Sequence, residues 1–305
     1  MTSFKDLARS FELRAPERMA FPRPAWEIND RKLFDRYAIA RKGVYNPQTD
    51  LPWSDLDLND YSEEDRIVLR YYWSRHAIFE HSLIMQISTG IQQTILEGYP
   101  SEIKQLLMMH LRDEWNHTEM TAEAARRLGG SLLVPSLPEH YKQQYEQRVK
   151  SLSRNIHPIF TRLSFSEMVS SHAWYGPFRE VRDPLAKAIF TYIYTDENRH
   201  SRSNWEWATK GVQNTDMKVP DEVRNETEQL LTNIANEKAP IYGWLGFGYL
   251  ELPKEEQEFH VQCMQIAKEL GVTLFDADEF LREYTRASRA LAKLLDQAGY
   301  SVKVA

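Results

Sequence analysis

The sequence predicts an all-α protein whose centre is a four-helix bundle with one long crossover. Glycine accounts for only 12 of 305 residues, which disfavours a turn-rich β protein. Long segments of helix-favouring residues alternate with clear helix start and stop signals. The connections between four of these segments follow a short, long, short order, which is typical of a bundle with one crossover.

The first pair of predicted helices covers residues 63–97 and 101–128. Ser62 is a good N-cap because its hydroxyl can accept a hydrogen bond from the first turn, and three acidic residues follow it. Pro100 stops the first helix, and Gly129 supplies a left-handed C-terminal cap for the second. Because the loop between them is short, we expect the two helices to be antiparallel neighbours.

The second pair follows a longer connection, in which residues 139–153 are expected to form a short charged helix. The third bundle helix follows Pro158 and ends before Asp183. Asp183 and Pro184 form an N-cap and first-position pair, so the fourth helix begins there and continues to Lys210. The short loop again predicts antiparallel neighbours.

We expect a single domain over residues 1–305, with its four-helix core at about 62–211. Additional helices are expected on the N-terminal side and in a C-terminal collar at 221–300, because no flexible linker separates that collar from the core. The predicted collar helices are residues 221–236, 254–270 and 277–297.

Composition and charge exclude several classes of function. A formal net charge of −6 gives no basic surface for nucleic acid, and no glycine-rich phosphate loop occurs. Cys263 is the only cysteine, so intramolecular disulfides and cysteine-rich metal sites are excluded. The aromatic and apolar run at 241–250 is half the length of a membrane span and is expected in the core or a dimer contact. With no secretory signal at the start, these features predict a cytoplasmic protein that binds neither nucleic acid nor a membrane.

One motif, Asp-Glu-x-x-His, occurs twice, at residues 113–117 and 196–200. On a helix, side chains three positions apart share a face, so the Glu and His of each motif can reach one ion. A single Glu-x-x-His is a weak signal, but two copies of the longer motif are much rarer by chance.

A lone glutamate precedes each motif at a similar distance. Glu80 lies 34 residues before Glu114, and Glu167 lies 30 residues before Glu197. When each helix pair folds back on itself, the lone glutamate comes level with its partner motif. The pattern therefore predicts a carboxylate-bridged dimetal site inside a four-helix bundle. The six predicted ligands are Glu80, Glu114, His117, Glu167, Glu197 and His200.

These residues resemble the motif of the ferritin-like dimetal-carboxylate superfamily, over residues 62–211 or about half of the chain. Within it, a glutamate followed by Asp-Glu-x-x-His, written twice, is most similar to the arylamine N-oxygenase family. The resemblance implies a non-heme di-iron oxygenase or oxidase, with two Fe ions or a mixed Mn/Fe pair, that activates O2 to oxidise a small organic substrate. It also implies that Glu114 and Glu197 bridge the two ions.

The resemblance assigns roles to residues around the ligands. It implies that Asp113 orients His200 and that Asp196 orients His117, each across to the opposite motif. Ser171, one turn after the third-helix glutamate, stands where hydroxylases of the superfamily place a threonine near the bound oxygen. Ser171 is therefore the predicted catalytic hydroxyl.

Several positions depart from these relatives. Ile193 stands where the N-oxygenases have a third histidine. This difference weakens the case for N-oxygenation, and hydroxylation, desaturation and oxidative C–C cleavage stay open. His110 and His76 each lie one turn before a ligand glutamate; His110 is the preferred candidate for a seventh ligand. Thr121 stands where radical-generating ribonucleotide reductase subunits carry a tyrosine, which excludes a stable tyrosyl radical at that position.

Three alternatives stay open. The chain could be an R2-like oxidase with a Mn/Fe centre, a ferroxidase or metal-binding protein without an organic substrate, or a helical scaffold with structural metals. The expected partners are O2 and a small molecule, and a homodimer is expected by analogy with the superfamily. The sequence identifies neither the substrate nor the electron donor.

Overall fold

The computed structural model describes residues 31–96, 99, 101–139, 142, 143, 146, 163, 165, 167–169, 178–213, 221–236, 252–275, 277–297 and 299–304. These residues form helices joined by turns and loops, and no strand occurs among them. The predicted all-α fold class is confirmed. None of the described helices is both long enough and apolar enough to span a membrane.

The first bundle helix, α3 (Glu63–Leu96), begins with the predicted cap. The Asp65 backbone N–H donates to Ser62 Oγ at 3.1 Å, and the Ser62 backbone N–H donates to the Asp65 carboxylate at 3.0 Å. This reciprocal pair satisfies N–H groups that the first turn leaves without a helical acceptor. The helix extends without interruption through 34 residues.

The second bundle helix has the predicted end and the fourth has the predicted start, but the fourth helix continues through Gly211 to Gln213, three residues beyond the predicted Lys210. α4 (Ser101–Arg127) ends where the Gly130 N–H donates to the Ala125 carbonyl at 2.9 Å, and both glycines that follow the helix have a positive φ. This is a Schellman cap, which L-residues with side chains rarely adopt. α7 (Pro184–Gln213) begins at Asp183, whose carboxylate accepts the Ala186 N–H at 2.7 Å.

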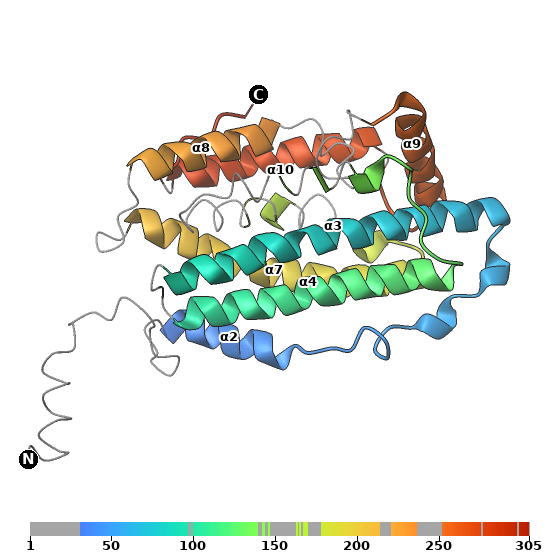
Figure 1. Cartoon of the computed structure of the whole chain (residues 1–305), viewed down its shortest axis with the longest axis horizontal. Helices are drawn as coiled ribbons and strands as arrows, with labels where there is room; N and C mark the ends of the chain where they lie inside the picture. Colours follow the sequence, from blue (N-terminus) through green and yellow to red (C-terminus); the bar gives the residue numbers. More distant parts are fainter. Residues whose placement is uncertain are drawn as a thin grey trace, which may run out of the picture.

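The bundle helices lie side by side along the long axis of the molecule (Figure 1). The start of α3 meets the end of α4 and the start of α7, so α4 is antiparallel to α3, and α7 is parallel to α3. The third bundle helix is described only at Leu163, Phe165 and residues 167–169, which are helical. Most of the predicted 139–153 helix and all of the 241–250 run lie outside the described residues.

Further helices cover the bundle (Figure 1). α2 (Arg31–Lys42) packs on α4 and α7, and α9 (Lys254–Glu269) packs on α3. α10 (Ala277–Gln297) contacts α8 (Asp221–Asn236) and α9. The collar helices agree with the predicted ranges to within one residue. Short 3-10 turns occur in the connections at Trp53–Asp55, Leu58–Asp60 and Phe178–Glu180.

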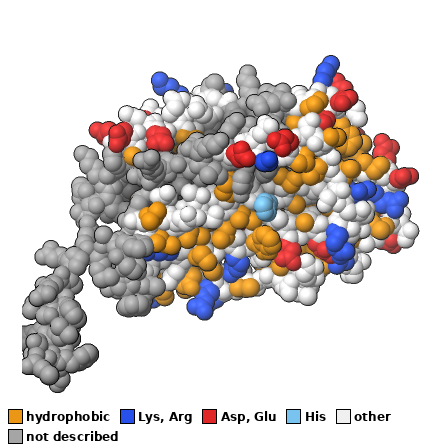
Figure 2. All heavy atoms as spheres, in the orientation of Figure 1, with side chains coloured by type: hydrophobic (Ala, Val, Ile, Leu, Met, Phe, Trp, Pro, Cys, Tyr) orange, Lys and Arg blue, Asp and Glu red, His pale blue; other side chains and the backbone are white. Residues whose placement is uncertain are grey.

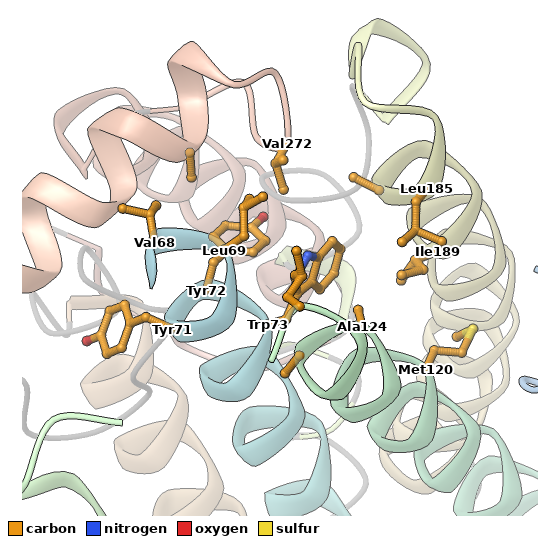
Figure 3. Close-up of a cluster of buried hydrophobic side chains, with 14 of the residues drawn as sticks. Val68, Leu69, Tyr71, Tyr72, Trp73, Met120, Ala124, Leu185, Ile189 and Val272 are labelled. Carbon is orange, nitrogen blue, oxygen red and sulfur yellow. The ribbon is translucent and has the colours of Figure 1, made fainter. Parts of the chain in front are cut away.

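One end of the bundle is closed by a large apolar cluster, which we call the Trp73 cluster. Figure 3 shows side chains of this cluster from α3, α4 and α7, together with Val272; Trp73 lies between α3 and α4, whereas Tyr71 points to the other side of α3. Trp73 is 2% exposed and Met120 is fully buried. Since each large apolar side chain buried on folding contributes about 1.5–3 kcal/mol, this cluster is a major source of stability. The labelled members are Val68, Leu69, Tyr71, Tyr72, Trp73, Met120, Ala124, Leu185, Ile189 and Val272.

A second cluster lies farther along α3 and nearer the start of α4, and we call it the Ile87 cluster. It joins Ile87 of α3 to Ile103 and Leu107 of α4 and to Leu163 of the third helix. A third cluster joins the third helix to α8 and α10 through Phe165, Leu231 and Leu291. The middle of the bundle, between the Trp73 and Ile87 clusters, contains the predicted ligands.

On the face shown in Figure 2, many hydrophobic side chains adjoin one another, and charged side chains of both signs lie around them. On the face shown, lysines and arginines are interspersed with acidic residues and form no continuous basic band.

We expect Met120→Ala to lower the free energy of unfolding by about 2–5 kcal/mol, because it leaves a cavity among helices that meet in the Trp73 cluster. Met108→Ala, on the same helix but 49% exposed, is the matched control and should change it by less than about 0.5 kcal/mol. Urea unfolding followed by circular dichroism measures both. Equal effects of the two substitutions would show that this end of the bundle is not packed as described.

Candidate metal centre

The predicted ligands converge at the middle of the bundle and form two overlapping groups of potential metal donors. In each group the donor atoms lie within 4.8 Å of one another, and every member is buried. Glu114 belongs to both, so it is placed to bridge two ions. Glu197, the second predicted bridge, belongs to one group only. We call the first the His117 group (Glu80, Glu114, His117 and Glu197) and the second the His110 group (His110, Glu114, Glu167 and His200).

The His117 group is rich in carboxylates. His117 Nδ1 lies 3.6 Å from Glu80, 3.7 Å from Glu114 and 3.8 Å from Glu197, measured to a carboxylate oxygen of each. These distances exceed those of hydrogen bonds, so the four side chains surround a common point without closing on it.

The His110 group contains two imidazoles. His110 Nε2 lies 2.7 Å from Glu167 and 3.1 Å from Glu114, in each case from a carboxylate oxygen. Its ring stacks on that of His200, with centroids 3.7 Å apart. His200 Nδ1 faces Glu114 at 3.6 Å.

The two motif aspartates hold the opposite histidines in place. His200 Nε2 lies 3.0 Å from Asp113, and His117 Nε2 lies 3.2 Å from Asp196. Arg199 donates to both aspartates, at 2.5 and 2.7 Å, and so ties the two motifs together. Because each Nε2–H points to an aspartate, each Nδ1 is left to face the ligand carboxylates.

Four residues beside the ligands and their aspartates were not predicted, and one of them is Arg112, whose Nε donates to Asp113 at 2.9 Å. Tyr45 Oη donates to Asp196 at 3.1 Å, and Asn204 Nδ2 donates to Glu167 at 3.3 Å. Arg199 lies inside the second motif, three positions after Asp196. Helical spacing places the two side chains on one face, so the contact between them could have been predicted. Asn204 shares a face with His200 by the same argument, whereas no local pattern identifies Tyr45.

The remaining predicted residues have different outcomes. His76 lies 3.3 Å from Glu80 but belongs to neither donor group, and its ring packs against Trp73 and Phe190. Ser171 lies outside the described residues, so its catalytic role stays a prediction.

Burial and mutual repulsion shift the titration of the cluster. Burial raises the pKa of Glu197 well above its usual range, and the charges of Glu114 and Glu167 add to this effect. Burial also raises the pKa of Glu167 to about 7, although the neighbouring His110 opposes the shift. For His110 itself, burial alone would lower the pKa, but Glu167 and Glu114 outweigh it and raise the pKa to about 10. Without metal, the cluster therefore retains protons at neutral pH.

The histidine and glutamate donors fit a pair of divalent cations. Within the part of the chain that the structure describes, several buried atoms of the two donor groups have no hydrogen-bond partner, among them Glu114 Oε2, His117 Nδ1, Glu197 Oε2 and His200 Nδ1. A buried polar atom without a partner costs about 1–3 kcal/mol, and more when it is charged. Carboxylates and imidazoles with such open positions suit Fe and Mn, and an ion would satisfy these atoms together.

A recess leads to one side of the cluster. Its walls include Ile103, Leu107 and Met109 of α4 and Ala40 of α2, and His110 and His200 lie at its inner end. The free volume is about 20 Å³, which is enough for a molecule the size of water or dioxygen. A larger compound needs these side chains to move.

Comparison with known proteins identifies the fold. No family model and no curated protein matches the chain. Three solved structures of R2-like ligand-binding oxidases are similar to it. One, with an aerobically reconstituted Mn/Fe cofactor, is 16% identical with a TM-score of 0.55, and the alignment covers 87% of this chain and 92% of that one. A point mutant with the same kind of cofactor is 17% identical with a TM-score of 0.57, over 88% and 98% of the two chains.

This chain has a ferritin-like fold. At such low identity the similarity concerns the fold alone, and the similarity specific to arylamine N-oxygenases stays a prediction. The two buried carboxylate and histidine groups lie inside this fold and fit a dimetal site.

We expect Arg199→Gln to lower the free energy of unfolding of the metal-free protein by about 3 kcal/mol, because Asp113 and Asp196 lose a cation that they share inside the bundle. Arg202→Gln, on the exposed face of the same helix, is the matched control and should have little effect. Urea unfolding in the presence of a chelator measures the difference. A similar loss in both variants would argue against the role of Arg199.

Metal affinity should increase with pH between 6 and 8. His110 and Glu167, with pKa values near 10 and 7, retain protons at pH 6, and an ion must displace those protons to reach the donor atoms. Each displaced proton strengthens binding about tenfold per pH unit below the relevant pKa. Anaerobic Mn(II) titrations followed by EPR at pH 6, 7 and 8 test this, and a pH-independent affinity would contradict it.

Proposed function

We propose that this protein is a dimetal oxidase or oxygenase that uses O2 to oxidise a small organic substrate. The reactions under consideration are N-oxygenation, hydroxylation, desaturation and oxidative C–C cleavage. We further propose that the metal pair is Fe/Fe or Mn/Fe and that the protein is a homodimer.

One observation carries this proposal. Two buried donor groups share Glu114, and their unsatisfied donor atoms face one another in a ferritin-like bundle. Three similar solved structures are R2-like ligand-binding oxidases with an aerobically reconstituted Mn/Fe cofactor, which supports the same class of activity here.

The protein groups set the geometry and the charge of the centre. Asp113 and Asp196 hold the protons on Nε2 of His200 and His117, so each Nδ1 lone pair is directed inward. Arg199 balances the charge of both aspartates, and Asn204 steadies Glu167. A bound metal pair supplies the electrons that reduce O2 and the oxidising power that acts on the substrate.

The recess supports access from the side of α2. Its apolar wall of Ile103, Leu107 and Met109 excludes bulk water and favours uncharged molecules such as O2. Its inner end at His110 and His200 places an incoming molecule beside the donor groups.

Glu114→Ala should lose both ions, because Glu114 is the donor common to the two groups. The test is anaerobic reconstitution with Fe(II), metal counting, and oxygen uptake after mixing with oxygenated buffer. Glu123→Ala is the matched control and should keep both ions, because Glu123 lies on the same helix, is 7% exposed, and pairs with Arg126 and Arg127 near the surface.

Three outcomes would contradict the proposal. A Glu114→Ala protein that retains two irons per chain excludes the shared-ligand site. A parent protein that binds two irons without consuming oxygen fits a structural metal site, and one that converts repeated additions of Fe(II) to mineral fits a ferroxidase.

The identity of the two metals is a separate measurement. Reconstitution with Mn(II) and Fe(II) together, followed by anomalous scattering at the two absorption edges, distinguishes Fe/Fe from Mn/Fe.

A further inference from the structure

The two donor groups are chemically unlike. Besides the shared Glu114, the His117 group offers one imidazole and two carboxylates, whereas the His110 group offers two imidazoles and one carboxylate. The difference is due to His110, which lies outside both Asp-Glu-x-x-His motifs. His110 is 3% exposed, and its Nε2 faces the same space as His200 Nδ1 and the carboxylate of Glu167.

His76 provides an internal comparison. It precedes Glu80 by one turn, as His110 precedes Glu114, and it is 1% exposed. Its ring, however, packs against Trp73 and Phe190, and it belongs to neither donor group. Equal spacing in the sequence thus leads to two different positions, and only His110 lies among other donors.

Resting on the proposed dimetal function, we propose that His110 is a seventh metal ligand, which gives the His110 group a preference for imidazole-favouring ions such as Co(II) and Fe(II) over Mn(II). Imidazole suits Fe, Co and their heavier neighbours, whereas carboxylate oxygens suit Mn. The His117 group lacks this second imidazole, so the two ions experience different ligand fields.

The recess is relevant to the test because His110 lies at its inner end. Truncation of His110 to alanine enlarges the recess at the point where the imidazole was. Free imidazole added to the solution can then occupy the vacated space and replace the lost donor.

The experiment uses anaerobic Co(II) and Mn(II) titrations of the parent chain, His110→Ala and His76→Ala, with and without added imidazole. We expect His110→Ala to lower Co(II) affinity at least about tenfold and Mn(II) affinity by less, and imidazole to restore part of the Co(II) affinity. The visible spectrum of bound Co(II) should change in His110→Ala and recover with imidazole. His76→Ala should change the spectrum less than His110→Ala does, and imidazole should not reverse the change, because His76 contacts the ligand Glu80 but belongs to neither donor group.

Three results would overturn the inference. They are an unchanged Co(II) affinity in His110→Ala, an equal loss for Co(II) and Mn(II) that imidazole does not reverse, or the same spectral change in His76→Ala. The equal loss would show that His110 only positions Glu167. In each of these cases the Glu114→Ala result still decides the proposed function independently, whereas a parent chain that binds no Co(II), Mn(II) or Fe(II) would reject both.

Discussion

The structure depends on keeping several carboxylates out of water in the middle of a helical bundle. Two like charges 4 Å apart repel by about 4 kcal/mol at an effective dielectric constant of 20, and burial adds a desolvation cost to each charge. The positive charge of Arg199 offsets part of this cost. Protons on His110, Glu167 and Glu197 offset more of it, and bound cations would replace these protons. The buried carboxylates at this level are Glu80, Asp113, Glu114, Glu167, Asp196 and Glu197.

Packing in the apolar clusters offsets the free-energy cost of burying these charges. The Trp73 cluster closes one end of the bundle, and the Ile87 cluster ties α3, α4 and the third helix on the other side of the centre. Both are continuous with the helices that carry the ligands, so the donor side chains are held in position before any ion arrives. The apolar layers therefore stabilise the positions of the donor side chains in the layer between them.

Much of the fold could be predicted because its signals are local. The cap at Ser62, the Schellman glycines after α4 and the Asp183-Pro184 start of α7 all depend on neighbouring residues. The meeting of each lone glutamate with its motif could be predicted for a similar reason. Helix length and a short loop determine which residues of two antiparallel helices lie at the same height in the bundle.

Other features depend on contacts between distant segments. Tyr45 reaches Asp196 across 151 positions of sequence, and no periodicity indicates that contact. The choice between His110 and His76 also lies beyond local pattern, because both precede a glutamate by one turn. It is decided by the surroundings: Glu167 and His200 meet His110, whereas Trp73 and Phe190 meet His76.

The recess lies on one side of the centre, against His110 and His200, and this geometry has a stereochemical consequence. If the proposed oxidation takes place at this centre and the side chains of the recess move to admit the substrate, α2, α4 and α7 would surround its approach on one side. The two faces of a prochiral substrate would then be unequal, and one enantiomer of the product would form in excess.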